Sequence, residues 1–180
     1  MLGVSRTSLR EALRELEIEG LISNIPNKGV IVTEMTLAGV RETYEIREAL
    51  EGLIVAKFAA NSTDAQIKLL EESLNKLEAA YSTSTKDVLA AKNIFYDLLM
   101  EGSGHILAST MLSSIQRRAG ALRLTTLSIP SRAKQSAIEL RLILSAIKTR
   151  EPEKAEAAAI NHVRNAGAMA LRILKERGVS

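Results

Sequence analysis

The spacing of apolar residues divides the chain into a short mixed segment and a long helical one. Over residues 5–19 apolar side chains recur every three or four positions, which predicts an amphipathic helix. Two β-type runs at 21–25 and 30–33 follow, and they flank the turn-forming sequence Pro-Asn-Lys-Gly, so they predict a hairpin. From residue 36 onward the period is helical throughout.

Six helices are predicted in the long segment, and short connections containing Asn, Ser, Gly or Pro separate them. Short connections favour antiparallel neighbours, which is the arrangement of a helical bundle. We therefore expect a mainly α protein with two domains, residues 1–34 and residues 35–180. The predicted helices cover about 36–60, 63–81, 85–101, 105–127, 131–150 and 152–177.

Composition supports a helical fold and excludes several kinds of chemistry. Apolar residues make up 46% of the chain and aromatic residues 3%, and the prevalence of Leu, Ala and Ile favours helix. The absence of Cys excludes disulfides and thiolate chemistry. The chain has only two His residues, no Glu-x-x-His pair of the kind that binds two metal ions in helical bundles, and no glycine-rich phosphate loop. Since it also lacks a plausible nucleophile and base, we expect that the protein is not an enzyme. No apolar run approaches the roughly 20 residues of a membrane span, so we expect a soluble, cytoplasmic protein with no membrane partner.

The helix and hairpin at the start of the chain match the second half of a winged helix-turn-helix, in which a recognition helix enters the DNA major groove. Arginine suits guanine and phosphate contacts, hydroxyls suit phosphate, and glycine at a wing tip permits close approach. The residues expected to bind DNA are Ser5, Arg6, Thr7 and Arg10 in the helix, with Lys28 and Gly29 at the hairpin tip. The alternative is that the arginines are solvated helix residues balanced by nearby glutamates, and the net charge of +3 does not decide between the two.

Three stretches of the sequence carry a family resemblance that covers nearly the whole chain. LGVSRTSLREALRELEIEGLI followed by PNKGVIV resembles the recognition helix and wing of GntR-type bacterial transcription regulators. TYEIREALEGLIVAKFAA (43–60) and IELRLILSAIKTREPEKAEAAAINHVRNA (138–166) resemble the FadR-like, or FCD, ligand-binding domain of one subfamily. The resemblance implies a partial winged helix-turn-helix followed by an all-α six-helix bundle, in a ligand-responsive, homodimeric regulator of transcription.

The same resemblance bears on DNA binding. Family members carry two further helices before the recognition helix, so the resemblance implies a chain truncated at its N-terminus. Without those helices the apolar face of residues 5–19 loses its packing partners, and we expect DNA binding to be weak or absent. The alternative function is a dimeric ligand-binding helical module with no competent DNA-binding domain.

The resemblance also implies a pocket inside the bundle that often holds a divalent metal, bound by an Asp and a His four residues apart and by two further His residues. At these four positions the chain has Lys92, Tyr96, Leu140 and His162. One remaining ligand of four cannot hold a metal, so we expect a degraded metal site and no cofactor.

The replacement of the metal ligands suggests a different pocket chemistry. Lys92 and Arg47 both lie on apolar stripes of their helices and should point inward. Buried cations need partners, and an anion would supply one, so we expect Arg47, Lys92, Tyr96 and His162 to clamp a small carboxylate effector. The alternative is that Arg47 pairs with Glu51 or Asp97, that Lys92 extends to the rim, and that the pocket is vestigial.

Overall fold

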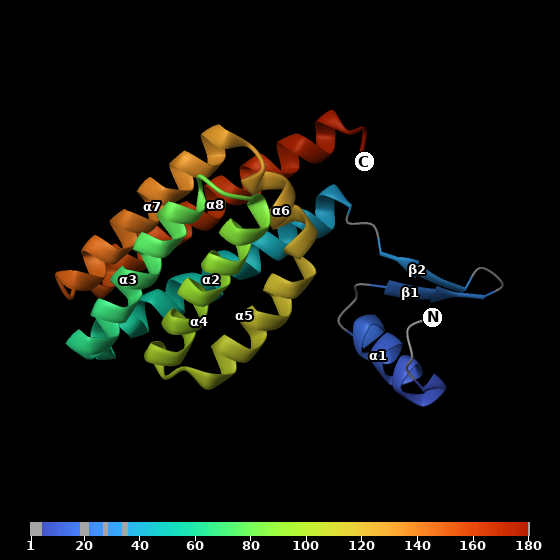
Figure 1. The fold of residues 1–180 in the computed structure, drawn as a ribbon, viewed down its shortest axis with the longest axis horizontal. Coiled ribbons are helices and arrows are strands. Elements are labelled where there is room, and N and C mark those ends of the chain that lie inside the picture. Colours follow the sequence, from blue (N-terminus) through green and yellow to red (C-terminus); the bar gives the residue numbers. More distant parts are fainter. Residues whose placement is uncertain (1–4, 19–21, 27–28, 34–35, 180) are drawn as a thin grey trace. The chain divides into compact units, whose positions relative to one another are not determined.

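The computed structural model describes residues 5–18, 22–26, 29–33 and 36–179, and it divides into two compact units, Met1–Thr36 and Leu37–Ser180. In the first unit, helix α1 (Arg6–Ile18) precedes an antiparallel hairpin of β1 (Ile22–Ile25) and β2 (Gly29–Val32), as Figure 1 shows. The predicted helix and hairpin are thereby confirmed.

Local chemistry explains where α1 and β2 begin. The Ser5 hydroxyl accepts a hydrogen bond from the Ser8 backbone N–H at 3.1 Å, which satisfies one of the free amides at the start of α1. Gly29 begins β2 with φ of 80°, a left-handed conformation that glycine adopts without steric cost. The Leu9 and Leu16 side chains of α1 are 46% and 37% exposed, and no residue of α1 is buried.

The second unit is a helical bundle, which confirms the predicted mainly α fold class. Helix α2 packs along α8, α7 packs against α8, and α3 packs against α4 (Figure 1). None of the helices in the described ranges is both long enough and apolar enough to cross a membrane. The helices are α2 (Leu37–Asn61), α3 (Asp64–Ala80), α4 (Thr85–Ser103), α5 (Ile106–Arg118), α6 (Gly120–Leu127), α7 (Pro130–Lys148) and α8 (Pro152–Glu176).

The main departure from the predicted helices is a division of the segment 105–127 into two. Ala119 ends α5 and directly precedes α6, with a bridge-region backbone of φ −78° and ψ 0°. The described part of the bundle therefore contains seven helices where six are predicted. Helix α6 carries a buried arginine, Arg123, into the bundle.

Capping residues fix the other helix ends close to the predicted positions. Thr63 and Gln66 form a reciprocal capping box at the start of α3, and Ser84 accepts from the Asp87 backbone N–H at the start of α4. Pro130 and Pro152 occupy the first positions of α7 and α8, where a missing N–H costs nothing.

The core of the bundle is aliphatic and tightly packed. Each fully buried Leu, Ile or Phe side chain contributes about 1.5 to 3 kcal/mol, so this cluster supplies the main driving force for folding. A methyl group added at Gly102 would lie 2.3 Å from Phe58 Cε2, so only glycine lets α4 approach that ring. The largest fully buried apolar side chains of the core are Ile54, Phe58, Leu70, Leu74, Leu77, Phe95, Leu99, Leu112, Leu140 and Ile147.

Candidate functional site

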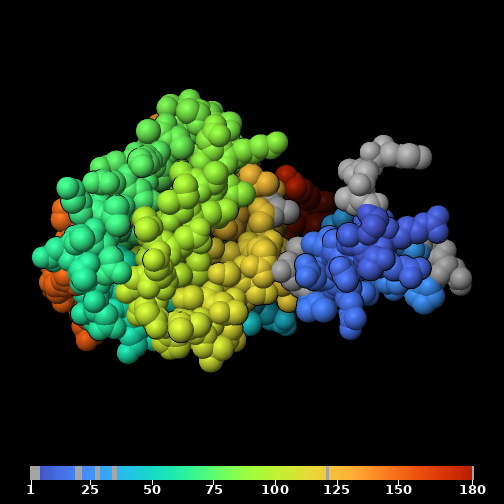
Figure 2. Space-filling model, turned by 60° about the horizontal axis from the view of Figure 1, so that its bottom comes forward, coloured from blue at the N-terminus to red at the C-terminus, as the bar shows by residue number. Residues whose placement is uncertain are grey.

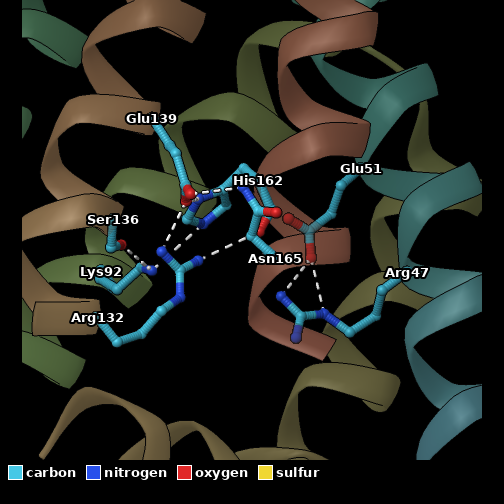
Figure 3. Close-up of polar contacts among 8 residues, drawn as sticks. All are labelled: Arg47, Glu51, Lys92, Arg132, Ser136, Glu139, His162 and Asn165. Carbon is cyan, nitrogen blue, oxygen red and sulfur yellow. Dashed lines mark hydrogen bonds and ion pairs between the residues drawn. The ribbon is translucent and has the colours of Figure 1, made fainter. Parts of the chain in front are cut away.

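All the buried charged side chains in the described ranges belong to one cluster at the middle of the bundle. They come from α2, α4, α6, α7 and α8, and Figure 3 shows most of them directed toward one another around His162. We call this group the charged cluster: Arg47, Glu51, Lys92, Arg123, Arg132, Glu139 and His162.

The four residues predicted to bind an effector are all buried in or beside the charged cluster. Arg47, Lys92 and His162 line one small cavity, which we call the inner cavity. Tyr96 is 3% exposed, and its ring lies beside Arg123, whose guanidinium carbon is 5.8 Å from the ring centroid. The structure therefore brings three of the four residues to one cavity and places the fourth next to it.

Arg47 is held by two neighbours on α2. Its Nε and Nη2 contact Glu51 Oε1 at 2.8 Å and 2.7 Å, which is one of the pairings expected in the alternative interpretation. Its guanidinium also lies 4.8 Å from the Tyr44 ring centroid. A methyl group at Gly167 would lie 2.9 Å from Tyr44, so glycine is required for α8 to pack against this ring. Burial raises the pKa of Glu51, but the charges of Arg47 and His162 and the hydrogen bonds to the carboxylate together outweigh burial, so the pKa is lowered from its usual value.

Lys92 lies deep in the bundle and does not extend to the rim. Its side chain is 6% exposed, and its Nζ donates to Ser136 Oγ at 3.0 Å and lies 3.4 Å from His162 Nε2. It has no ion-pair partner among the described residues. Burial, together with the charges of Arg123 and Arg132, lowers the pKa of Lys92 well below its usual value.

His162 is fixed by a network on its other ring nitrogen. Its Nδ1 lies 2.6 Å from Glu139 Oε2, and Arg132 Nη1 donates to the same oxygen at 2.8 Å (Figure 3). Asn165 Nδ2 donates to Glu139 Oε1 at 2.8 Å. Burial and the charge of Lys92 lower the pKa of His162 to about 4, although the hydrogen bond with Glu139 opposes them. The ring is therefore neutral at pH 7, with Nδ1–H donating to Glu139 and the Nε2 lone pair facing Lys92.

Three members of the charged cluster were missed from the sequence: Arg123, Arg132 and Glu139. A signal for two of them exists, because Arg132 and Glu139 lie seven residues apart, with Ser136 between them, on the face of α7 that also buries Ile143. The signal for Arg123 is its position in an apolar stretch, close to the buried Leu122 and Leu127. That signal is weaker, because α6 was not predicted as a separate helix.

The charged cluster contains more positive than negative charge. Four cationic side chains (Arg47, Lys92, Arg123 and Arg132) face two carboxylates (Glu51 and Glu139), which leaves a formal excess of two positive charges when Lys92 is protonated. Buried charges normally have partners, so this excess is unusual. Four buried polar atoms near the inner cavity also have no hydrogen-bond partner: Tyr44 Oη, Arg47 Nη1, Tyr96 Oη and Arg123 Nη2.

The inner cavity has a volume of about 20 Å³, which is enough for one water-sized group. The donors around it are cationic or neutral N–H and O–H groups, and such groups bind anions. The arrangement thus fits a single anionic group, such as the end of a carboxylate, and leaves no room there for the rest of an organic acid.

The same residues do not fit a divalent metal. Lys92 directs an amine toward His162 Nε2, and the other nitrogen of His162 is engaged by Glu139. Leu140, at the position of a further family ligand, is a fully buried aliphatic side chain. No group of three or more His, Cys, Asp or Glu side chains in the described ranges is arranged to hold a metal ion.

In the first unit, the residues expected to bind DNA lie at the surface. Ser5, Arg6, Thr7 and Arg10 are exposed at the start of α1, where free backbone N–H groups and the helix dipole favour phosphate. Gly29 is exposed at the first position of β2, while Lys28 lies outside the described residues. Exposed cationic and hydroxyl groups at a helix start suit contact with a phosphate backbone.

Comparisons with known proteins agree with both units. The FCD domain matches residues 42–165, and the family of bacterial regulatory proteins called gntR matches residues 1–32. The chain is 28% identical to the transcriptional regulator YdhC of Bacillus subtilis over 162 residues, covering 89% of this chain and 72% of YdhC. It is 25% identical to the transcriptional repressor RspR of Escherichia coli over 174 residues, covering 96% of this chain and 76% of RspR.

Among solved structures, that of Escherichia coli McbR/YncC has the same fold. It superposes with a TM-score of 0.85 at 22% identity, over 96% of this chain and 87% of that one. The family matches are to transcription regulators and not to enzymes. The chain therefore belongs to the GntR family of bacterial transcription regulators, in the subfamily whose helical ligand-binding domain is an FCD domain.

Proposed function

We propose that this regulator senses a small organic acid through the charged cluster of its helical unit. The observation that carries the proposal is the excess of buried positive charge, together with the unpartnered N–H groups of Arg47 and Arg123 beside the inner cavity. A bound carboxylate would neutralise part of that charge and accept those hydrogen bonds. The protein without effector would then hold a set of unsatisfied groups that binding relieves.

Each of the four predicted residues has a distinct role in this proposal. Arg47 offers the free Nη1 of its fork, and Lys92 offers an ammonium group where the family resemblance implies a metal. Tyr96 donates its free hydroxyl, and neutral His162 holds the Lys92 amine in position. The ammonium supplies the positive charge directly, so the proposal requires no metal or other cofactor.

On the DNA side, we propose that Ser5, Arg6, Thr7 and Arg10 contact the operator, with Lys28 and Gly29 at the wing. GntR-family regulators bind DNA and typically act as dimers, which places two recognition helices on two half-sites. The effector regulates DNA binding only if it binds two arrangements of the dimer with different affinity.

A thermal-shift screen of small carboxylic acids, including dicarboxylates and sugar acids, tests the sensing function. At least one acid should raise the melting temperature of the wild-type protein, and Lys92→Met should abolish that rise. Lys57→Met is a matched control, because Lys57 is exposed on α2, and it should keep the response. If no acid raises the melting temperature, the sensing proposal is wrong.

A second candidate function is a dimeric ligand-binding module that does not bind DNA. The observation that favours it is the exposed apolar face of α1, which buries none of its residues within the described first unit. Limited proteolysis with and without DNA separates the two functions. Cleavage confined to residues 1–34, unchanged by a saturating DNA duplex, supports the second candidate, whereas protection of these residues by DNA supports the first.

A further inference from the structure

The inner cavity contains a nucleophile, because one of the side chains that line it, Lys92, ends in a primary amine. On the face of the bundle shown in Figure 2, side chains of α4 and α5 (light green to yellow) form the surface. Lys92 belongs to the same helix α4, but it is 6% exposed and lies in the interior. A primary amine that is shielded from water and carries no extra proton attacks electrophilic carbon readily. The surroundings of Lys92 therefore decide whether this amine can react.

The amine of Lys92 makes two polar contacts, both with residues that line the same cavity. Its Nζ donates to Ser136 Oγ at 3.0 Å and lies 3.4 Å from His162 Nε2 (Figure 3). Because Nε2 carries the lone pair of the neutral ring, it accepts the second N–H of the amine. A neutral amine whose two hydrogens are engaged in this way keeps its own lone pair free. That lone pair is the group that attacks an electrophile.

The charges around Lys92 favour its neutral form. Arg47, Arg123 and Arg132 line the inner cavity with it, and no Asp or Glu is among the described residues that do so. Burial and the charges of these arginines lower the pKa of Lys92 well below its usual value, although Glu51 opposes them. When the amine is neutral, the charged cluster still has three arginines and two carboxylates, an excess of one positive charge. A single negative charge added at Lys92 would cancel that excess.

The three arginines interact with the end of Lys92 in opposite ways in its two possible charged forms. They repel an ammonium group, as the lowered pKa of Lys92 reflects. The same guanidinium groups attract an anionic group at that position, and guanidinium is well suited to carboxylate oxygens. Chemistry that converts the amine into an anion therefore turns an unfavourable arrangement of charge into a favourable one.

The size of the inner cavity limits what the amine can meet. Its volume of about 20 Å³ suits the end of a carboxylate and leaves no room for an attached chain. Carbon dioxide is small and uncharged, so it enters without the cost of removing an anion from water. Once carbon dioxide is joined to Nζ, the anionic end has no further substituent, because its one attachment is the lysine itself. We propose that Lys92 reacts with carbon dioxide to form a carbamate, which the arginines of the inner cavity stabilise.

The reaction consumes carbon dioxide and releases one proton. The lone pair of neutral Nζ forms a bond to the carbon, and one electron pair of a C=O bond moves onto its oxygen, which gives the carboxylate of the carbamate. The N–H directed at His162 loses its proton to Nε2, and the ring then releases that proton to solvent. The remaining N–H stays donated to Ser136 Oγ. Nothing is oxidised or reduced, and the step needs no further reactant.

This inference goes beyond the proposed sensing of an acid and does not depend on it. The carbamate occupies the inner cavity and supplies the negative charge that an acid effector would supply. The modified chain therefore does not bind an acid at Lys92, and the two states exclude each other. Dissolved carbon dioxide is in this way a second signal to the regulator, read through the same side chain.

Chemical trapping followed by peptide mass spectrometry tests the inference on the wild-type protein. Triethyloxonium ethylates a carbamate and so prevents it from losing carbon dioxide during digestion. After equilibration with carbon dioxide at pH 7, the peptide containing Lys92 should carry one ethoxycarbonyl group. This adduct should be at least tenfold more abundant than in protein kept in buffer free of carbon dioxide. Lys57, exposed on α2 and outside the inner cavity, is the internal control and should give at least tenfold less adduct.

Carbon-13 NMR of the intact protein under labelled carbon dioxide provides an independent measurement. A carbamate resonance separate from those of carbon dioxide and bicarbonate should appear in the wild type and be absent from Lys92→Met. Arg123→Met should weaken this resonance at least threefold, because it removes one of the charges that favour the anion. Arg172→Met, on an exposed position of α8, is the matched control and should leave it unchanged. Circular dichroism should show that each variant is folded.

The outcomes separate this inference from the proposed function. If the Lys92 peptide of the wild type carries no more adduct than the Lys57 peptide, the inference is wrong, whether or not an acid binds. A broadened bicarbonate resonance without an adduct would show that bicarbonate binds without reacting, which would also overturn it. An adduct at Lys92 in a protein that responds to no acid in the thermal-shift screen would support this inference and leave the acid-sensing proposal wrong.

Discussion

Lys92 Nζ lies 3.4 Å from His162 Nε2, at the centre of the bundle, so an amine occupies the side of the imidazole on which a metal would bind. The other ring nitrogen is held by Glu139 at 2.6 Å. The pKa values of both buried groups are lowered, which means that protonation of either one is less favourable in the folded protein than in water. The site is thus organised around positive charge that the folded chain does not fully compensate.

Lys92→Met should stabilise the protein when no acid is present. The substitution removes a buried cation that lies close to Arg123 and Arg132, and replacing buried charge with an apolar group of similar size is often stabilising by about 1 to 4 kcal/mol. We expect a rise of about 1 kcal/mol or more in the free energy of unfolding, measured by urea denaturation in a carboxylate-free buffer. A loss of about 2 kcal/mol or more, as in truncation of the core, would contradict this account.

The stability of the bundle should fall as the pH decreases from 7 to 5. The folded-state pKa of His162 is about 4, below the usual value of 6.5, so its contribution is present above pH 6.5 and is lost as the pH falls toward 4. Between pH 7 and pH 5 this amounts to roughly 2 kcal/mol. The lowered pKa of Lys92, which faces the ring, makes its contribution decrease as the pH falls below its usual value of 10.5. Glu139, with a pKa of about 2, loses its contribution only below about pH 4.5.

Urea unfolding at the two pH values measures this difference directly. His162→Gln should reduce the pH-dependent loss of stability by roughly 2 kcal/mol. Ile143→Val is the control, because it removes one buried methyl group and should lower stability equally at both pH values. A pH-dependent loss of the same size in His162→Gln as in the wild type would show that the ring is not held neutral.

Much of this structure was predictable because its determinants are local. The hairpin follows from a Pro-Asn-Lys-Gly turn between β-type runs, and the helix starts at Thr63 and Pro152 follow from capping and proline chemistry. Apolar stripes also indicated that Arg47 and Lys92 point inward, and both are buried.

The remaining features depend on contacts between distant segments. The pairing of Arg132 with Glu139 and His162 spans two helices, and no local pattern specifies which carboxylate a buried cation will meet. The end of α5 at Ala119 lacks a proline, and its geometry depends on how α5 and α6 pack on the bundle. Arg123 was missed for this reason, because its direction is defined only once α6 is a separate helix.

Two glycines of the bundle should respond oppositely to the same substitution. Gly102→Ala places a methyl group 2.3 Å from the Phe58 ring and should destabilise the protein by about 1 to 3 kcal/mol. Gly120→Ala meets no neighbouring atom within 4 Å and should stabilise it by about 0.4 to 1 kcal/mol, through reduced freedom of the unfolded chain. Differential scanning calorimetry of the two variants should therefore give melting temperatures on opposite sides of the wild type, and shifts of the same sign would contradict the packing described.

Arg6 and Arg10 should control the salt dependence of DNA binding. Each arginine that neutralises a phosphate contributes about 0.9 to the slope of log K against log salt concentration on duplex DNA. Arg6→Ala and Arg10→Ala should each lower that slope by about 1, measured by fluorescence anisotropy with a random-sequence duplex. Arg172→Ala, an exposed residue of α8, is the control and should leave the slope unchanged. Unaltered slopes in all three variants would place the DNA contacts elsewhere.

The central claim is that the charged cluster binds an anion, and bromide tests it without knowledge of the natural effector. Crystals soaked in sodium bromide would be measured at the bromine absorption edge. We predict an anomalous peak in the inner cavity, in contact with Lys92 or Arg123, and its loss from crystals of Lys92→Met. Bromide peaks confined to the solvent-exposed surface, with none in the inner cavity, would contradict the account.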